Sequence, residues 1–292
     1  MVGKSMQKLM LGGVYVSSQD YNLSDEASVI RMYRDIQPDA VVHLAAKVGG
    51  IMDNINKPAE YFDDNIIMNT LVVRHAYLHG VKRFIGILST CIYPDHIQHY
   101  PIAEEVLHDG PPAVTNFSYG YAKRSLAVQI EAYNKQYGTN YQYLTPCNLY
   151  GEFDKYGDNS HFVAALIKKI HLAKINHQDN ITLFGDGTPL RQFMHSDDLA
   201  GVIAICLNND VYTSMNVAVE DNLSIREMTD IVKTAMGASH LTAQFDTTKP
   251  NGQHRKDVSI NLLKTHIPTF SPIKLEDGVR NTYDYLLTNN IL

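Results

Sequence analysis

Short apolar runs alternate with longer amphipathic stretches through the first half of this 292-residue chain. A continuous apolar run is typical of a strand buried on both faces of a sheet, whereas apolar residues three and four apart are typical of a helix. The pattern predicts strands at residues 14–16, 40–46, 84–88 and 141–144, and helices at residues 26–36, 59–78 and 121–136. This order predicts an α/β fold, a parallel sheet covered by helices on both faces, with ligands beyond the carboxyl ends of the strands.

The second half of the chain is less regular. Helices are predicted at residues 162–173, 198–208 and 224–236, and strands at residues 181–184 and 215–219. The strand at residues 215–219 is expected in the same sheet as the strands of the first half. Ser196 or Asp197 is the predicted cap of the second helix, and Ser224 caps the third, with Glu227 completing a capping box. Residues 1–150 and 190–220 therefore form a predicted nucleotide-binding layer, and residues 151–189 and 221–292 a smaller lobe.

The candidate chemistry begins where the predicted strand 84–88 ends, at Ser89. Some thirty residues later, Tyr119 and Lys123 stand four apart and share one face of a helix. A lysine ammonium near a phenol lowers its pKa from ~10, so that the phenol can exchange a proton with a carbonyl oxygen. Ser89 can hydrogen-bond the same oxygen. The three residues are suited to hydride transfer to a ketone.

Taken alone, a tyrosine and a lysine four residues apart are also typical of an ordinary pair on a helix surface. The upstream serine at the end of a buried strand favours the catalytic interpretation. Tyr121 is only two residues from Lys123 and therefore points elsewhere.

Several longer stretches make a family resemblance specific. They are residues 43–50 (HLAAKVGG), 89–94 (STCIYP), 116–124 (NFSYGYAKR), 146–151 (PCNLYG) and 191–200 (RQFMHSDDLA). The chain resembles the GDP-L-fucose synthases, which are extended short-chain dehydrogenases/reductases. The resemblance implies a Rossmann-type doubly wound parallel sheet with a smaller α/β substrate lobe. It also implies NADP(H) as cofactor and a GDP-linked 4-keto-6-deoxymannose as substrate, epimerised at C3 and C5 and then reduced at C4.

The resemblance also implies a role for two further residues. Cys91 matches the base that removes a proton from the carbons beside the ketone, and His161 matches the acid on the opposite face. Both roles suit the side chains, since a thiol and an imidazole titrate near ~8.5 and ~6.5. From the residues alone, Cys91 also fits a small buried side chain, and His161 a residue bonded to backbone at a helix start. Cys147 is interpreted as packing.

Binding residues are implied by the same resemblance. The substrate contacts are Asn148, Lys169, Arg191 and Lys256, of which the cations face the diphosphate. The cofactor contacts are Gly3, Asn22, Leu23, Ala45, Ala46, Lys47, Asn65, Tyr119, Lys123, Pro146, Asn148, Leu149 and His161. Ser17 and Ser18 leave room for the 2′-phosphate. Helices near residues 65–78 and 121–136 imply a homodimer with a four-helix interface.

The start of the chain lacks the expected glycine-rich turn between a first strand and a first helix. Residues 1–9 resemble the end of such a turn, namely its last glycine, together with the first helix. We therefore expect the first strand and the earlier glycines to lie upstream of Met1, or the cofactor site to be altered in this chain.

Composition limits the classes of binding partner, the compartment and the metal sites that this chain can have. The formal net charge of −6 gives no basic surplus for nucleic acid or an anionic membrane. Three cysteines without paired spacing, and no signal-like apolar segment, favour the cytoplasm. His75 and His79 have the spacing of metal ligands but no third ligand, so solvated or interface histidines are expected and no metal is predicted.

Two other functions remain open at this stage. One is a C4-reductase of another nucleotide-linked 4-keto sugar, for example a heptose, which does not epimerise. The other is a non-catalytic GDP-sugar-binding protein, which the absent glycine-rich turn suggests.

Overall fold

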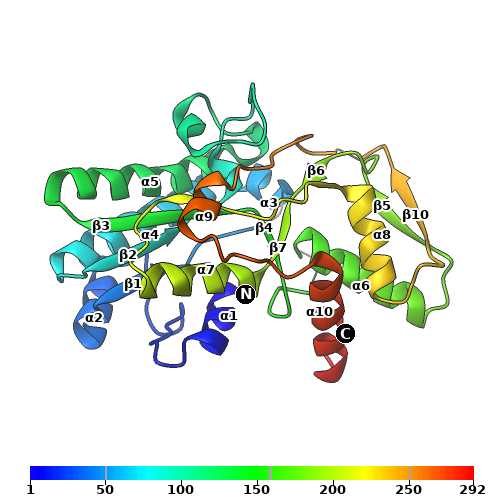
Figure 1. Ribbon diagram of the computed structural model, residues 1–292, viewed down its shortest axis with the longest axis horizontal. Coiled ribbons are helices and arrows are strands. Elements are labelled where there is room, and N and C mark those ends of the chain that lie inside the picture. The colour runs from blue at the N-terminus through cyan, green and yellow to red at the C-terminus, as the bar shows by residue number, and fades with distance from the viewer. Residues whose placement is uncertain (50, 158–159, 250) are drawn as a thin grey trace.

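The computed structural model describes residues 1–49, 51–157, 160–249 and 251–292. Gly50, the last residue of the stretch 43–50, lies outside the described residues. A parallel sheet of four described strands occupies the centre of the larger part of the molecule, in the order β1-β2-β3-β8 (Figure 1). These strands are β1 (Ala40–His43), β2 (Arg83–Ile87), β3 (Asn140–Pro146) and β8 (Met215–Val217). Every residue of β2 is buried, as its apolar run predicts.

Helices cover both faces of this sheet, which confirms the predicted α/β class. Figure 1 shows α5 (Phe117–Tyr137) above the sheet and α7 (Ser196–Asn208) below it. On the upper face α5 packs against α4 (Pro58–Leu78), which also contacts α2 (Glu26–Ile36). On the lower face α1 (Val2–Leu9) packs against α7. None of the described helices combines the length and the apolar character that crossing a bilayer requires.

A second apolar core lies beside the first, on the right in Figure 1. Its elements are α6 (Phe162–Ile175), β5 (Asn180–Phe184), α8 (Ile225–Ala235), β10 (Thr242–Asp246) and α10 (Leu275–Thr288). β5 and β10 pair in parallel over their full length. Val258, Leu263 and Ile267 pack instead into the core of the large sheet, although they come after β10 in the chain.

Short elements connect the two cores. β4 (Asn148–Tyr150) pairs with β7 (Phe193–His195), and β6 (Leu190–Arg191) pairs with β9 (Leu223–Ser224). The remaining short helices are η1 (Thr90–Ile92), η2 (Glu104–His108), η3 (Val114–Asn116), α3 (Ile51–Asn56) and α9 (Asn261–His266).

The strand predicted at residues 14–16 is wrong. Val14 and Val16 are 71% and 42% exposed and belong to no sheet. Within the described residues β1 is hydrogen-bonded to β2 alone, so no sheet includes residues 14–16.

The strand predicted at residues 40–46 ends early, at His43. Beyond it, the backbone N–H of Lys47 donates to the side chain of Asn65 at 3.0 Å. A side chain thus replaces the sheet as the partner of the backbone, and the chain turns away from the strand direction.

The predicted caps of α7 and α8 have different outcomes. α7 begins at Ser196, and its cap is His195, whose imidazole accepts from the N–H of Asp197 at 3.2 Å. The prediction of Ser196 or Asp197 was therefore wrong by one or two residues. For α8, the Ser224–Glu227 capping box is confirmed.

Candidate active site

The end of β2 carries the first two candidate residues. After Leu88 the backbone turns into η1, and Ser89 is the cap of that short helix. Its hydroxyl accepts from the N–H of Cys91 at 3.4 Å. A serine at this position therefore satisfies a backbone donor and places its oxygen beyond the carboxyl end of the strand.

Helix α5 brings Tyr119 and Lys123 to the same place. The phenol of Tyr119 is hydrogen-bonded to the Ser89 side chain. Lys123 is only 2% exposed, and its ammonium donates to the carbonyl oxygen of Ile87 at 2.8 Å. The predicted grouping of Ser89, Tyr119 and Lys123 at one end of β2 is therefore present in the structure.

The electrostatics of this group differ from the prediction. Burial raises the pKa of Tyr119, with a smaller upward contribution from Cys91, and this outweighs the opposing hydrogen bond from Ser89. The expected lowering by Lys123 is absent, because the ammonium is directed to the carbonyl of Ile87. Burial lowers the pKa of Lys123 itself to about 8, since no carboxylate in the described chain pairs with it. Tyr119 is thus a neutral phenol that can donate a proton.

Cys91 is half-buried and lies between cationic side chains. The ammonium of Lys256 is 3.8 Å from its sulfur. Arg191 is also near, since the proximity of Cys91 opposes the burial that lowers the pKa of the guanidinium. Two of the donors of Arg191 bind the carbonyl oxygens of Leu190 and Gln253, at 2.7 and 2.6 Å. The contact between Cys91 and Lys256 joins residues 165 positions apart, and no spacing in the sequence indicates it.

His161 stands apart from this group. It is the cap of α6, and its side chain is 53% exposed. Its Nδ1 lies 2.9 Å from the buried carboxylate of Asp154, and this hydrogen bond raises the pKa of His161. No hydrogen bond or ion pair of the described chain connects His161 with Ser89, Cys91 or Tyr119. Asp154 was not predicted, because it precedes His161 by seven residues without a recognisable motif.

The predicted substrate contacts in the small lobe are held by backbone atoms. Lys169 donates to the carbonyl of Thr182, and Asn148 donates to the carbonyl of Gln192 at 3.0 Å. These bonds place both side chains beside β5 and β7.

Asn65 organises the turn predicted to contact the cofactor. It is fully buried, accepts from the N–H of Lys47 and donates to the carbonyl of the same residue at 3.1 Å. The Lys47 ammonium binds Glu60 and Asp64, each at 2.7 Å. Asn65 therefore fixes the segment that contains Ala45 and Ala46.

The other predicted cofactor contacts are dispersed over four elements. Gly3 lies in α1, and Pro146 and Leu149 lie in β3 and β4. Asn22 precedes α2, where its N–H donates to the hydroxyl of Ser28 at 2.9 Å, and Leu23 is the next residue. A cavity of about 360 Å³ lies near this turn, lined by residues that include Val16, Tyr21 and Arg31. The hydroxyl of Ser17 donates to Asp20.

Cys147, His75 of α4 and His79, which directly follows α4, have packing roles. Cys147 is 6% exposed, and burial raises its pKa to about 12, in agreement with the predicted packing role. His75 is 4% exposed and its Nε2 lies 3.0 Å from Glu26, whereas His79 stacks on Tyr33. His75 is therefore not solvated, because α2 covers it, and the alternative of an interface histidine stays a prediction.

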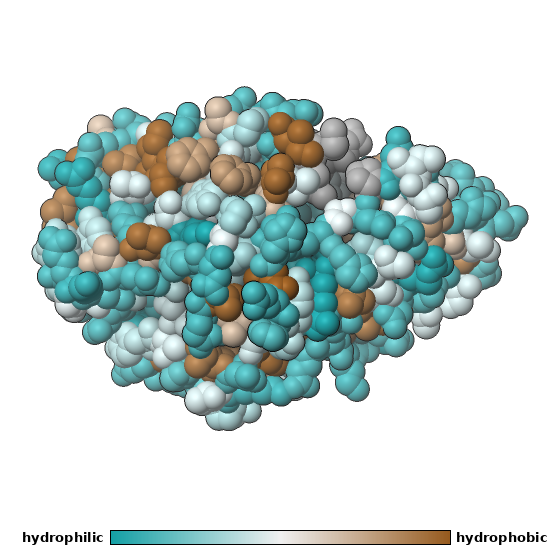
Figure 2. Space-filling model, turned by 90° about the horizontal axis from the view of Figure 1, so that it is seen from above, coloured by the Kyte–Doolittle hydropathy of each residue, from teal (hydrophilic) through white to brown (hydrophobic). Residues whose placement is uncertain are grey.

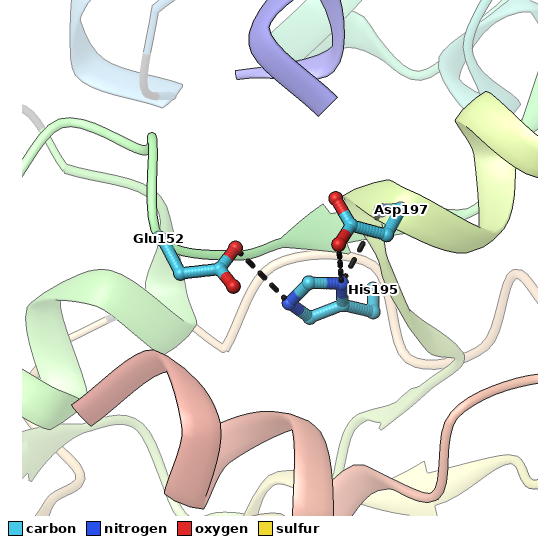
Figure 3. A group of neighbouring side chains, drawn as sticks. All are labelled: Glu152, His195 and Asp197. Atoms are coloured by element: carbon cyan, nitrogen blue, oxygen red, sulfur yellow. Dashed lines mark hydrogen bonds and ion pairs between the residues drawn. The ribbon is translucent and has the colours of Figure 1, made fainter. Parts of the chain in front are cut away.

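A polar group that was not predicted joins α1 to the start of α7. Figure 3 shows the imidazole of His195 between the carboxylates of Glu152 and Asp197. Its Nε2 is 3.4 Å from Glu152, and the interaction with His195 lowers the pKa of Glu152 to about 2. The Lys8 ammonium lies 2.7 Å from Asp197 and 3.6 Å from Glu152.

The three ligand-type side chains could in principle hold a metal ion. However, His195 Nδ1 accepts from the N–H of Asp197, so this nitrogen is already engaged and is not available to a metal ion. The Lys8 ammonium already supplies a positive charge to both carboxylates. We interpret this group as an ion-pair network that fixes α1 on the sheet.

The site thus combines two chemical capacities. Ser89 and Tyr119 offer two hydroxyls that can bind one carbonyl oxygen, and Lys123 is a buried cation at the same end of β2. Cys91 provides a thiol, a base when ionised, beside the same oxygen-binding pair.

Comparisons with known proteins agree on one family. Residues 7–218 match the NAD dependent epimerase/dehydratase family. A GDP-L-fucose synthase from Dictyostelium discoideum is 37% identical over 282 residues, which cover 94% of this chain and 87% of that protein. One from Sinorhizobium fredii is 35% identical over 278 residues, with 94% and 88% covered. The crystal structure of a GDP-L-fucose synthetase from Naegleria fowleri bound to NADP superposes with a TM-score of 0.89 at 30% identity, covering 99% of this chain and 92% of that one.

Proposed function

The chain belongs to the NAD dependent epimerase/dehydratase family, and we propose that it is a GDP-L-fucose synthase. It epimerises GDP-4-keto-6-deoxymannose at C3 and C5 and reduces the product at C4 with NADPH. The observation that carries this proposal is the meeting of Ser89, Tyr119 and Lys123 at the end of β2 with the thiol of Cys91 beside them.

The catalytic end of the site fits NADP(H). Lys123 is a buried cation whose described partner is a single carbonyl oxygen, so N–H donors remain for the hydroxyls of a bound ribose. The turn that Asn65 fixes, at Ala45 and Ala46, lies after β1, at the edge where α/β sheets bind nucleotides. Bound NADPH supplies the hydride for C4.

Reduction requires a proton at the C4 oxygen. Tyr119 supplies it from its phenol, whose raised pKa keeps the proton in place until negative charge develops on the oxygen. Ser89 donates a second hydrogen bond to the same oxygen.

Epimerisation uses the same oxygen-binding pair. The Cys91 thiolate removes the proton from C3 or C5, and the electron pair of the C–H bond moves to the oxygen held by Ser89 and Tyr119. His161 returns a proton to the opposite face. Its hydrogen bond to Asp154 supports this role, because a raised pKa maintains the imidazolium form at higher pH.

The GDP moiety is bound by cations. Arg191 and Lys169 are the proposed partners of the diphosphate, and Asn148 contacts the sugar or its phosphate. Arg191 is supported by its position close to Cys91, which places a guanidinium beside the reacting sugar.

We further propose a homodimer through α4 and α5. The two helices pack against each other and expose large apolar side chains, among them Ile67, Leu78, Val128 and Tyr137. Figure 2 looks down on the α5 side of the molecule, where apolar residues gather over the left half of the face. Apolar patches of this kind are typical of protein–protein contacts.

Consumption of NADPH with GDP-4-keto-6-deoxymannose tests the proposal. The chain should oxidise NADPH only when this sugar is present, and Ser89→Ala should slow the reaction at least tenfold. Binding of the GDP-sugar without NADPH consumption would identify a non-catalytic binding protein instead. Reduction without exchange of protons at C3 and C5 would identify a simple C4-reductase.

A further inference from the structure

The polar contact of Lys256 is a thiol. Its ammonium lies 3.8 Å from the sulfur of Cys91, and the described chain places no carboxylate at ion-pair distance from it. We infer that Lys256 is a positioning residue for Cys91, which holds the sulfur in place beside the oxygen-binding pair of Ser89 and Tyr119. The inference deepens the proposed function, in which that thiolate is the base.

The backbone on both sides of Lys256 is fixed. Ile102 forms a bridge with Val258, in which the N–H of Ile102 donates to the carbonyl of Asp257 at 2.8 Å and the N–H of Ser259 donates back at 2.8 Å. Before Lys256, the carbonyl of Arg255 accepts from the hydroxyl of Tyr100 at 3.0 Å. The Lys256 side chain therefore extends from a backbone that hydrogen bonds hold in place on either side.

Gln192, which lies between β6 and β7, holds the same segment through its side chain. Its side-chain amide accepts from the N–H of Val258 at 2.9 Å and donates to its carbonyl at 3.2 Å, and Gln192 is 4% exposed. Because Gln192 is the residue after Arg191 in the chain, one local segment positions both cations near Cys91.

The neighbouring carboxylate does not compete for Lys256. Asp257 is 4% exposed and binds Arg255 through two contacts, to Nε at 2.6 Å and to Nη2 at 3.0 Å. A carboxylate engaged by a guanidinium in this way is neutralised locally. The charge of Lys256 therefore acts on the thiol.

Among the described residues, the charged or titratable groups that contact Cys91 or interact with it electrostatically include Lys256, Arg191 and Tyr119. The two cations complement the negative charge of the thiolate that acts as the base in the proposed reaction. When the thiolate takes a proton from carbon, an S–H bond forms, the C–H bond breaks, and its electrons pass to the enolate oxygen. Lys256 takes no part in this transfer and acts through Cys91.

Family resemblance assigns Lys256 to the substrate diphosphate, and the two roles predict different losses. A diphosphate contact affects substrate binding and leaves the thiol of the free protein unchanged. A positioning residue affects the reactivity of Cys91 before any substrate is present.

The alkylation rate of Cys91 by iodoacetamide at neutral pH separates the two roles. Trypsin releases residues 84–123 as one peptide in which Cys91 is the single cysteine, so mass spectrometry monitors this thiol alone. Lys256→Met should slow its alkylation roughly tenfold, whereas Lys256→Arg should retain most of the rate. Lys249→Met, which removes an exposed lysine from the same lobe, should leave the rate unchanged.

An unchanged alkylation rate in folded Lys256→Met would overturn the inference, above all if the KM for the GDP-sugar rises. Should that variant fail to fold, Lys256→Gln replaces it, since the amide still donates but carries no charge. The assay needs neither sugar nor NADPH. A failure of the proposed function would instead appear as a wild-type protein without turnover.

Discussion

Gly120 lies so close to the backbone of Cys91 that a Cβ atom on it would be 2.7 Å from the carbonyl oxygen of Cys91. The same atom would be 2.8 Å from the side chain of Pro112. Both distances are shorter than van der Waals contact, so a glycine is required at this position in α5. Since Tyr119 precedes Gly120, this contact sets the distance between the phenol and the segment that carries Ser89 and Cys91.

Gly120→Ala should therefore destabilise the protein by about 1–3 kcal/mol, because the added methyl group forces α5 away from Cys91. Turnover should fall more than stability, since the displacement separates Tyr119 from Ser89. Urea unfolding and NADPH oxidation measure the two effects. Gly201→Ala, in α7, is the matched control: nothing lies within 4 Å of its added methyl group. It should stabilise the helix by up to about 1 kcal/mol. Equal behaviour of the two variants would refute the packing argument.

Removal of the Tyr119 hydroxyl should abolish most of the reduction. Tyr119→Phe leaves the fold intact but deletes the proton donor, and a loss of roughly 10²–10⁴-fold in kcat is expected for a general acid. Tyr121→Phe is the control, since it removes the same atom two residues further along α5. Steady-state kinetics with NADPH compare them, and similar losses in both variants would exclude Tyr119 as the specific donor.

Asp154 should set the pH range of the epimerisation step. Its hydrogen bond raises the pKa of His161, so the proton-donating imidazolium persists to higher pH in the native protein. In Asp154→Asn the pKa of His161 falls, and the decline of solvent-deuterium exchange on the alkaline side should begin at lower pH. Exchange measured across a pH series checks this. An alkaline limb at the same pH in the variant and the wild type would contradict this role of Asp154.

Glu152 should stabilise the fold in a pH-dependent way. The contact with His195 lowers its pKa to about 2 from the usual 4.5, so its contribution is fully present above pH 4.5 and is lost as pH falls toward 2. Glu152→Gln should cost on the order of 2 kcal/mol near neutral pH, with the difference shrinking in acid. Urea titrations at several pH values provide the measurement.

The control for Glu152 is Glu276→Gln, which breaks an exposed helix pair with Arg280. It should cost less than about 0.5 kcal/mol at any pH, because water screens the pair. A loss in Glu152→Gln that is independent of pH would contradict the assignment.

The sequence predicted most of the central sheet, because buried parallel strands appear as continuous apolar runs. The limits of α2 were predicted to the residue, and β2 begins one residue before its apolar run. Residues 14–16 have the same composition but no strand, since a strand depends on a pairing partner that its own sequence does not encode. The short strands β4, β6, β7 and β9 were missed because a run of two or three residues is too short to show a hydrophobic pattern.

The candidate site was predictable where its residues are close in sequence. Ser89 with Cys91, and Tyr119 with Lys123, have spacings that geometry explains. The contact of Lys256 with Cys91 and the hydrogen bond of Asp154 to His161 depend on how distant or irregular segments pack, so no spacing revealed them. The direction of the pKa of Tyr119 was also mispredicted, because burial is a property of the fold.

Conversion of GDP-4-keto-6-deoxymannose by this chain with NADPH in deuterium oxide tests the central claim most directly. Mass spectrometry and proton NMR of the product locate each deuterium. We predict GDP-L-fucose that carries deuterium at both C3 and C5, with protium from NADPH at C4. A product reduced at C4 but free of deuterium at C3 and C5, or no product at all, would contradict the account.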